Sequence, residues 1–532
     1  MKTQRLFLFL FLFCANAVAE EPLCQPVNDS VEGLEIGEIK ILNQDIFDLN
    51  NVNENAVIHK LANNLHWQTR VTTIKQQLLF QPGQKYNQHL INETERKLRS
   101  RNYLHAVSIY ADKICDNKVI VVVNTSDNWT LTPSISYGRS GGINRSSIEI
   151  SESNLLGLGK SIKFKSESDE DRDSQYIQYN DDNLLGSQYK LAVKTAENSD
   201  GYFDSITVGK PFFQLGSTES ILLDTFRLKK QIAIYDNGII TDITGQETKG
   251  INLRYGWSSG IQNGQVIRYK LGWSLTDNTY FNVTDYPDSL LPEEKKLRFP
   301  YFGFEYQEDR YIQRENFNVM GVIEDVSIGN LLSAQIGLLN KSWGSSHDGY
   351  KISANYSSGF DINAITLGFI QLGLNSEVNQ HAEDFNSLSF NWRLLHYQDS
   401  NHSYFLKAEY LVADNLLPND QYVIGGDSGL RGYPIRFQTG HTKALLSVEK
   451  RSYFNWYPWK LVKFGVAIFA DIGSAWEKNE SANIISDVGI GIRLVSTRQS
   501  DSKVLHIDFA YPLDEQDKVD GFQLLLKAKS QF

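Results

Sequence analysis

Long hydrophobic runs are nearly absent from this 532-residue sequence. Beyond the N-terminus no stretch approaches the roughly 18 apolar residues that a membrane-spanning helix needs. Any crossing of a membrane must therefore be made by strands. Clusters of basic residues are missing too, and the net charge is −11. Because phosphate binding needs a concentrated Lys/Arg face, we expect no nucleic-acid partner.

Motifs for catalysis or cofactor binding are also missing. The sequence has no HExxH, no CxxC pair and no Walker loop, so we expect no metal, nucleotide or other cofactor. Gly426-Asp427-Ser428-Gly429 spells the residues around the nucleophile of chymotrypsin-like proteases. No histidine stands in the Ala-His-Cys setting of that chemistry, and Leu430 occupies the place where a G-x-S-x-G elbow needs glycine. We therefore expect no catalytic residue and no enzyme.

The one apolar run lies at the N-terminus and is typical of an export signal. Lys2 and Arg5 precede Leu6–Phe13, and Ala17-Val18-Ala19 forms a small-x-small cleavage pattern. Residues 1–19 are therefore predicted to be a signal peptide.

Cysteine is scarce, with three in the whole chain. Cys24 and Cys115 remain after the predicted cleavage, and exported chains meet oxidising conditions that favour a bridge. We expect these two to pair, with two buried thiols as the alternative.

Residues 34–126 have the pattern of a compact α+β domain within a segment 20–128. Hydrophobic periodicity predicts the order β-α-α-β-β, since strand patterns enclose two helical patterns, the second of which has one apolar side. The expected elements are Glu35–Leu42, Asn55–His66, Gln88–Arg101, Val107–Ile114 and Val119–Val123. About 100 residues suffice for an independent core.

From residue 129 to 532 the pattern changes to alternation broken by polar turns. Ile251, Leu253, Tyr255 and Trp257 alternate with residues that include Asn252 and Arg254. The strands of a soluble β-sandwich also alternate between apolar and polar residues. Charged side chains on the face opposite an aromatic stripe, however, need water on that face. A transmembrane barrel with a watery lumen supplies one.

An internal repeat supports a barrel. Asn154-Leu155-Leu156-Gly157 recurs as Asn183-Leu184-Leu185-Gly186 and, more loosely, as Phe213-Gln214-Leu215-Gly216, with the glycines 29 and 30 residues apart. This period fits two strands with one short and one longer connection. The three sites are therefore predicted to be successive turns on one side of a membrane.

The C-terminus has the pattern of a last barrel strand. Even positions from Phe522 are mostly apolar, and the chain ends on the aromatic Phe532. Such a strand closes a barrel on its first strand, because an open edge is not viable in lipid.

Gly425–Pro434 concentrates glycines around a single arginine, Arg431. Glycine allows backbone conformations that other residues resist, so this tip is constrained. From these residues alone it could be a mobile surface loop or a loop folded back into a barrel lumen.

Two groups of motifs resemble one known family. "TRVTTIKQQLLFQPGQKYNQHLINETERKLRSRNYL" followed by paired strands and "WTLTP" resembles a POTRA domain placed directly before a barrel. Arg431-Gly432-Tyr433 resembles the sixth-loop tip of the POTRA-barrel translocase superfamily, the bacterial surface antigen group of BamA-like and TamA-like factors and two-partner secretion transporters. Gly489–Arg493 and Asp508–Leu513 add further similarities.

The resemblance implies site residues. The loop tip would be Gly429, Leu430, Arg431, Gly432 and Tyr433, folded into the lumen. Its arginine would contact Asp471 in an F-x-D-x-G setting, here Phe469, Asp471 and Gly473. The alternative is that Asp471 caps a strand end. If the two pair, we expect Arg431→Ala and Asp471→Ala to cause similar losses.

The resemblance also implies the fold and function. We expect a mainly β protein of the outer membrane, with a periplasmic POTRA domain and a barrel of sixteen antiparallel strands, which allows about 25 residues per strand. It would insert or transport client polypeptides without chemistry. Unfolded clients would add to a POTRA edge at His105–Ile114, or that edge only packs on the barrel mouth. Partners would be outer-membrane lipid, these clients and periplasmic accessory proteins.

Two alternatives remain for the function. One is a dedicated two-partner-type secretion pore, although such transporters usually have two POTRA domains and a plugging helix. The other is a passive channel or structural barrel.

Overall fold

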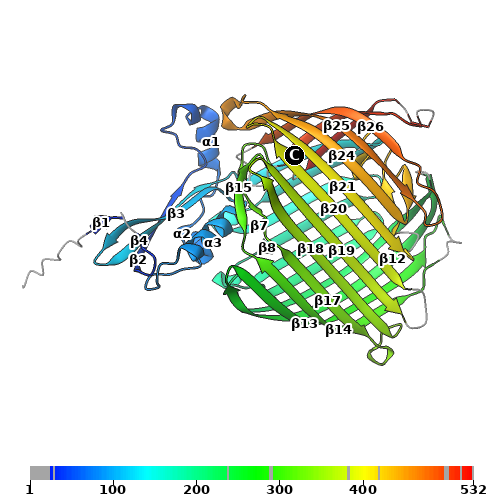
Figure 1. Ribbon diagram of the computed structural model, residues 1–532, viewed down its shortest axis with the longest axis horizontal. Coiled ribbons are helices and arrows are strands. Elements are labelled where there is room, and N and C mark those ends of the chain that lie inside the picture. The colour runs from blue at the N-terminus through cyan, green and yellow to red at the C-terminus, as the bar shows by residue number, and fades with distance from the viewer. Residues whose placement is uncertain are drawn as a thin grey trace, which may run out of the picture.

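The computed structural model describes residues 24–27, 30–236, 239–286, 291–379, 384–416, 420–496, 503–515, 518–519 and 521–529. The predicted signal peptide 1–19 and the terminal Phe532 lie outside the described residues. The described chain forms a small N-terminal domain (residues 24–127) followed by a large barrel (Figure 1). No helix in these ranges is both long enough and apolar enough to cross a membrane.

The N-terminal domain is a four-stranded sheet with the order β1-β3-β4-β2. Its elements are β1 (Cys24–Pro26), β2 (Glu35–Gln44), α1 (Val57–Leu65), α2 (Val71–Gln77), α3 (Gln88–Arg99), β3 (Leu104–Cys115) and β4 (Lys118–Asp127). The central strand β4 pairs in parallel with β2 and antiparallel with β3. Its Val119, Val121 and Val123 are fully buried in the core, as befits a β-branched run between two neighbours.

The domain has one helix more than the sequence predicted, because the described residues contain α2 between the two expected helices. The pattern missed α2 since its seven residues are rich in β-branched types, which disfavour isolated helices. Tertiary contacts stabilise it: Ile74 is fully buried in the core, and the Thr73 hydroxyl donates to the Gly157 carbonyl at 2.7 Å.

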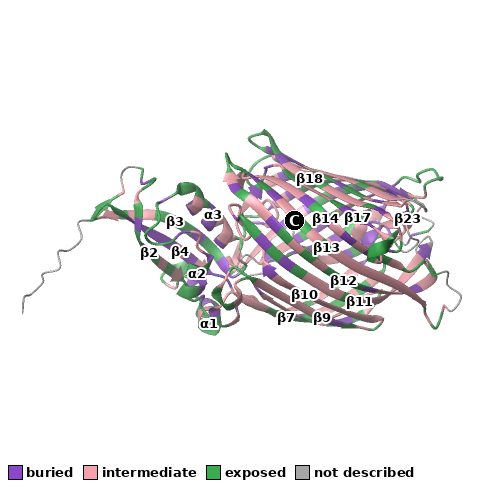
Figure 2. Ribbon diagram, turned by 90° about the horizontal axis from the view of Figure 1, so that it is seen from below, coloured by how far each residue is buried: buried purple, intermediate pink, exposed green. Residues whose placement is uncertain are grey.

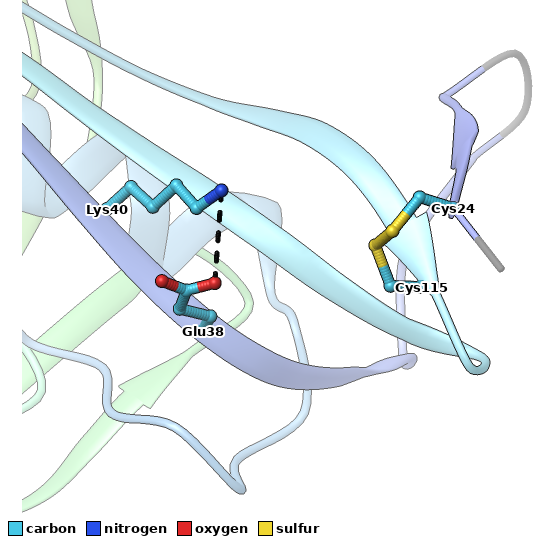
Figure 3. The surroundings of a disulfide bond; sticks show 4 residues. All are labelled: Cys24, Glu38, Lys40 and Cys115. Carbon is cyan, nitrogen blue, oxygen red and sulfur yellow. Dashed lines mark ion pairs between the residues drawn. A yellow bond between two sulfur atoms is a disulfide. The ribbon is translucent and has the colours of Figure 1, made fainter. Parts of the chain in front are cut away.

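A disulfide joins Cys24 on β1 to Cys115 at the end of β3 (Figure 3). The two residues are also direct register partners in the sheet. The bridge closes a loop across 91 positions of sequence and so holds the start of the described chain on the sheet edge.

The barrel is closed and antiparallel, and its described residues form 20 strands. These are β5 (Leu131–Ser140), β6 (Ile143–Glu152), β7 (Lys160–Ser168), β8 (Asp173–Asp181), β9 (Lys190–Asn198), β10 (Gly201–Lys210), β11 (Glu219–Asp236), β12 (Ile239–Gln262), β13 (Gln265–Asn282), β14 (Lys295–Glu308), β17 (Leu331–Leu339), β18 (Gly349–Asn363), β19 (Thr366–Asn379), β20 (Phe385–Tyr397), β21 (His402–Asp414), β24 (Thr442–Tyr453), β25 (Val462–Trp476), β26 (Ile485–Ser496), β27 (Val504–Pro512) and β28 (Gln523–Lys529).

The mainly β class is as predicted, but the expected sixteen strands are wrong. The number came from the family resemblance, whereas β5 to β10 are only nine or ten residues long with short connections. Six strands therefore fit into residues 131–210. The period of 29 and 30 residues per strand pair already indicated this density.

The barrel wall alternates between two environments. On β12, Ile251, Leu253 and Tyr255 are exposed on the outer face. Figure 2 shows the resulting bands of buried and exposed residues along the wall. An outer face of exposed aliphatic and aromatic side chains suits a lipid solvent.

The repeated turns all meet the N-terminal domain. The Arg70 amide donates to the Gly157 carbonyl at 3.0 Å, and the Leu215 amide donates to Glu93 of α3 at 2.6 Å. Asn183 accepts a hydrogen bond from Gln77. The repeat therefore marks the barrel end on which the domain rests.

Candidate functional site in the barrel lumen

The connection between β21 and β24 folds back against the inner wall of the barrel. It contains the short strands β22 (Tyr422–Ile424) and β23 (Gln438–Gly440), which pair with each other. Between them, Leu430 and Tyr433 are fully buried against Leu445 of β24 and Ile485 of β26. We call residues 422–440 the lumen loop. Its apolar side chains explain why it packs inward, since exposure would cost their burial energy.

A tight backbone approach positions the tip of the lumen loop. Gly429 has a φ of +110°, and a Cβ there would lie 2.4 Å from the Leu445 side chain. Gly473, in the predicted strand motif, likewise leaves room for Ile424, whose Cδ1 would lie 2.8 Å from an added Cβ. Glycine at these two positions lets the tip lie flat on the wall.

The Arg431 guanidinium is the centre of the site. Its Nε and Nη2 donate to the two oxygens of Asp471 on β25 at 2.7 and 3.0 Å. Its Nη1 donates to Glu449 of β24 at 2.7 Å and lies 3.7 Å from Asp508 of β27. The guanidinium also lies over the Phe469 ring, 3.4 Å from the centroid. With 8% exposure, Arg431 is held by three strands at once.

Further charges extend this network along the wall. Arg451 donates to the second oxygen of Glu449 at 2.9 Å, and the fully buried Arg493 pairs with Asp508. Acids and bases thus alternate across β24 to β27. Such a network compensates each buried charge and specifies one loop position rather than adding much net stability.

The two residues after Arg431 make backbone contacts on the same side. The Gly432 amide donates to Asp487 of β26 at 2.9 Å. The Tyr433 hydroxyl donates to the Ser486 carbonyl at 2.9 Å and accepts from the Asp514 amide at 3.2 Å. The predicted arginine-glycine-tyrosine tip therefore contacts the wall through all three residues.

Asp427, before the tip, connects the two sides of the barrel closure. It accepts from Lys527 of the last strand β28 at 2.5 Å and pairs with Arg145 of β6 at 3.0 Å. These strands flank β5, where the barrel closes. Between β28 and β5, the register among described residues pairs Leu526 with Arg139, whereas seven pairs join β27 to β28. We call the β28–β5 boundary the seam.

Arg436 fastens the far end of the lumen loop. It contacts Asp171 at 2.8 Å and Glu170 at 3.2 Å, both in the connection between β7 and β8. Its guanidinium also lies 4.2 Å from the ring centroid of Tyr235 on β11. The acidic stretch after Ser168 therefore lies at the barrel end opposite the N-terminal domain.

The sequence did not identify Glu449 as a partner of the lumen loop. Nor did it identify Asp427 and Arg436 as the loop residues that hold it to other parts of the barrel. Glu449 and Arg451 are two positions apart on one strand, so the alternation of side chains places both on the same face. This spacing could have predicted that both point into the lumen. Asp427 and Arg436 gave no comparable signal, because their partners lie 100 or more positions away.

A cavity of about 840 Å³ adjoins the tip. Its lining carries both signs of charge, including Lys443 and Glu409 with the Arg431 network. The part of the chain that the structure describes holds no group of three His, Cys, Asp or Glu residues arranged for a metal ion.

A hairpin lies across the opposite mouth of the barrel, facing the N-terminal domain (Figure 1). It comprises β15 (Tyr311–Glu315) and β16 (Ile323–Ser327), between β14 and β17. Its turn residue Met320 is buried against the inner wall of β24 to β27, at Tyr453, Ala467 and Val495 among others. We call residues 309–330 the mouth hairpin. No sequence motif predicted it.

The edge predicted for client binding is β3. β1 covers only Lys113–Cys115, and no other described strand pairs with this side of β3. The Ile109 amide instead donates to the Glu95 side chain of α3 at 3.0 Å. The predicted range His105–Ile114 therefore lies on a sheet edge that one helix side chain partly satisfies.

Comparison with known proteins gave one family match. The model described as "Omp85 superfamily domain" matches residues 154–527. No curated protein matches the sequence.

Solved structures resemble the chain loosely. BamA from Haemophilus ducreyi lacking POTRA domains 1–3 is 12% identical with a TM-score of 0.39, covering 92% of this chain and 84% of that one. CdiB from Acinetobacter baumannii is 13% identical with a TM-score of 0.44, covering 93% and 74%. CdiB from Escherichia coli is 12% identical with a TM-score of 0.46, covering 95% and 79%.

Proposed function

The chain belongs to the Omp85 superfamily, and we propose that this member inserts client polypeptides into the outer membrane through the seam of its barrel. Membership makes it an outer-membrane β-barrel protein that acts in protein insertion or translocation. Proteins of this superfamily work by assembly and transport rather than by catalysis. Two features of the barrel favour insertion over secretion: the short pairing across the seam and the obstructed lumen.

The seam carries the proposal. Few backbone hydrogen bonds join β28 to β5 in the described register, so separating these strands exposes fewer unpaired groups than separating any long pair such as β11 and β12. A client strand can replace those bonds by adding to the exposed edge. Asp427 bridges Lys527 and Arg145 across the seam, so the lumen loop holds the closed form.

The lumen itself is obstructed in two places. The lumen loop is fastened to the inner wall by Arg431, and the mouth hairpin lies at the end that faces the N-terminal domain. A dedicated secretion pore would have to move both segments to pass a chain. Lateral insertion requires that the seam opens and that Asp427 releases one of its two partners, but neither segment has to leave the lumen. This favours an assembly function over the two-partner-type pore and the passive channel.

The N-terminal domain delivers the client in this proposal. It lies in the periplasm as a POTRA domain of residues 34–126 and presents the β3 edge to unfolded polypeptides and accessory proteins. An arriving strand would pair with the backbone that Glu95 satisfies now. The domain rests on the barrel turns that follow β6, β8 and β10, and β4, the neighbour of β3, leads through residues 128–130 directly into β5 at the seam.

Proteomics of the outer membrane and of the culture medium after depletion of the protein distinguishes the three functions. Loss of several unrelated barrels supports insertion. Loss of one secreted or surface protein would identify a dedicated exporter and contradict the proposal. If neither fraction changes, the barrel is passive, and its bilayer conductance is then the property to measure.

A disulfide lock tests the seam directly. Arg139→Cys with Leu526→Cys joins register partners across the seam. Ser147→Cys with Glu167→Cys joins partners on β6 and β7 as a matched control. We expect the seam lock alone to abolish client insertion into proteoliposomes, measured by protease protection, and reduction to restore it. The unmodified protein treated with the same reductant controls for the native disulfide. Full insertion by the locked barrel would contradict the seam mechanism.

A further inference from the structure

Helix α1 exposes its apolar side and turns its polar side toward the protein, which is the reverse of a helix in a water-soluble domain. Val57, Leu61 and Leu65 lie on one side of the helix and are 83%, 54% and 58% exposed. The side that faces the protein is polar and includes His59, which is 1% exposed. A helix of a soluble protein normally buries its apolar side and shows its polar side to water.

The polar side is fastened by specific hydrogen bonds, so the reversed orientation is not a loose packing arrangement. Asn63 exchanges two hydrogen bonds with the backbone of Phe47, at 2.8 and 3.1 Å. The His59 ring packs on the Phe47 ring with centroids 4.5 Å apart. The helix therefore presents its apolar side outward as long as the domain is folded.

The helix is also fastened to the barrel at its periplasmic rim. His59 Nε2 donates to the Trp459 carbonyl at 3.1 Å, and Lys460 pairs with Glu54, just before α1, at 2.8 Å. Trp459 and Lys460 belong to the connection between β24 and β25. Figure 1 shows α1 beside this orange connection, away from the sheet of the N-terminal domain.

The same connection carries exposed aromatic side chains that continue the outer belt of the barrel. Trp456 is 65% exposed and stacks on Phe464, with ring centroids 4.5 Å apart. Phe464 shares the outer face of β25 with the exposed Ile468. Tryptophan at the rim of a barrel marks the boundary between hydrocarbon and headgroups. The apolar side of α1 thus begins where the lipid-facing surface of the barrel ends.

We infer that α1 lies in the periplasmic leaflet of the outer membrane and binds phospholipid through its apolar side. The exposed apolar side chains of α1 and of the residues next to it are Val52, Val57, Ile58, Leu61, Leu65 and Trp67. Lys60, exposed on the polar flank, is placed to meet headgroups. Because α1 is fastened to both the domain and the barrel, the lipid contact holds the N-terminal domain at one tilt beneath the barrel.

Depth-dependent quenching tests the inference on the full chain. Leu61→Cys is labelled with an environment-sensitive fluorophore, with the native disulfide left oxidised, and the protein is reconstituted in vesicles of phosphatidylethanolamine and phosphatidylglycerol. Lys60→Cys, one position away on the polar flank, is the matched control. We expect quenching by a doxyl-labelled phospholipid to be several-fold stronger at position 61 than at 60, and quenching by aqueous iodide to show the reverse order.

A second variant separates lipid binding from local packing. With the label at Ile58→Cys, the added changes Leu61→Ser and Leu65→Ser should remove the lipid quenching, and since both side chains are exposed, the domain stays folded. Equal access of iodide to positions 60 and 61 would overturn the inference. A label shielded from both quenchers would overturn it too, because a client or a second copy of the chain would then cover the helix.

Discussion

Arg99 of α3 donates two hydrogen bonds to Asp325 of β16, at 2.7 and 3.0 Å, and so ties the N-terminal domain to the mouth hairpin. Arg99 also pairs with Glu95, the residue that accepts from the Ile109 amide on the β3 edge. A strand that adds to β3 competes for this amide. If a client adds to β3 as we propose, its binding is linked to the position of the mouth hairpin through Glu95, Arg99 and Asp325.

Loss of the Arg99–Asp325 pair should loosen the mouth hairpin. We expect Arg99→Ala and Asp325→Ala each to increase the frequency of open-channel events in planar bilayers several-fold, and the double variant to be little worse, because both remove the same contact. Arg101→Ala is the matched control, since Arg101 pairs with Asp182 on a barrel turn rather than with the hairpin. An equal increase in Arg101→Ala would show that any loosening of the domain opens the channel.

The Arg431 network predicts that Arg431→Ala loses more stability than Asp471→Ala. Arg431→Ala leaves Asp471, Glu449 and Asp508 without their shared cation, whereas Asp471→Ala leaves Arg431 paired with Glu449. Removing one member of a buried pair costs about 3–5 kcal/mol of folding free energy. Because Arg431→Ala leaves three carboxylates without this partner, it should be the more destabilised of the two variants. This replaces the expectation of similar losses, which assumed one partner.

The measurement is the temperature at which the folded barrel band unfolds in semi-native electrophoresis, together with client insertion in proteoliposomes. Arg254→Ala, a lumen arginine on β12 that pairs with Asp224 at 3.4 Å, serves as the control and should change little. Equal losses in Asp471→Ala and Arg431→Ala, with additive effects in the double variant, would contradict this prediction. They would mean that Glu449 does not compensate for the loss of Asp471 and that the two residues act separately.

Gly432→Ala should destabilise the tip through contact alone. A Cβ at this position would lie 2.7 Å from the Asp487 Cβ and 3.0 Å from the Pro512 backbone nitrogen. We expect a loss of about 1–3 kcal/mol, typical of overpacking, measured as a lower midpoint of denaturant unfolding. Gly521→Ala, with open space at its Cβ, should leave the midpoint unchanged. A neutral Gly432→Ala would mean that the tip can move off the wall.

The N-terminal domain should lose stability as pH rises because of His66. Burial, the largest single influence, opposes the charged imidazolium. The hydrogen bonds to Asp127 at 3.3 Å and to the Asn63 carbonyl, with the nearby charges of Asp127 and Asp45, together outweigh it, and the pKa of His66 is raised above 6.5. The stabilisation is therefore complete below the unfolded pKa and is lost as pH rises through the higher folded value. Asp127 also accepts from the Thr69 amide at 2.7 Å, so this amide reports the change.

Hydrogen exchange of Thr69, corrected for intrinsic pH dependence, is the measurement. Its protection should fall as pH rises from about 5.5 to 8.5. His66→Gln should remove this dependence while keeping a polar side chain. Pronounced pH dependence in His66→Gln would assign the effect to another group.

Local pattern alone determined much of this protein. Alternation at Ile251–Trp257 needs only the two-residue period of a strand, and the signals for the helices at α1 and α3 need only the 3.6-residue period. The glycine repeat at 157, 186 and 216 reports turns for the same reason, since turn chemistry is encoded in a few adjacent residues.

Tertiary structure decided what depends on distant positions. Barrel closure selected 20 strands, since strand number follows from the tilt and stagger of all strands together rather than from any one. The contact of Glu449 with Arg431, the path of the mouth hairpin to Met320 and the outward side of α1 depend on which walls and surfaces come together in space. The sequence pattern at α1 indicated a helix, and only the fold showed that its apolar side faces away from the protein.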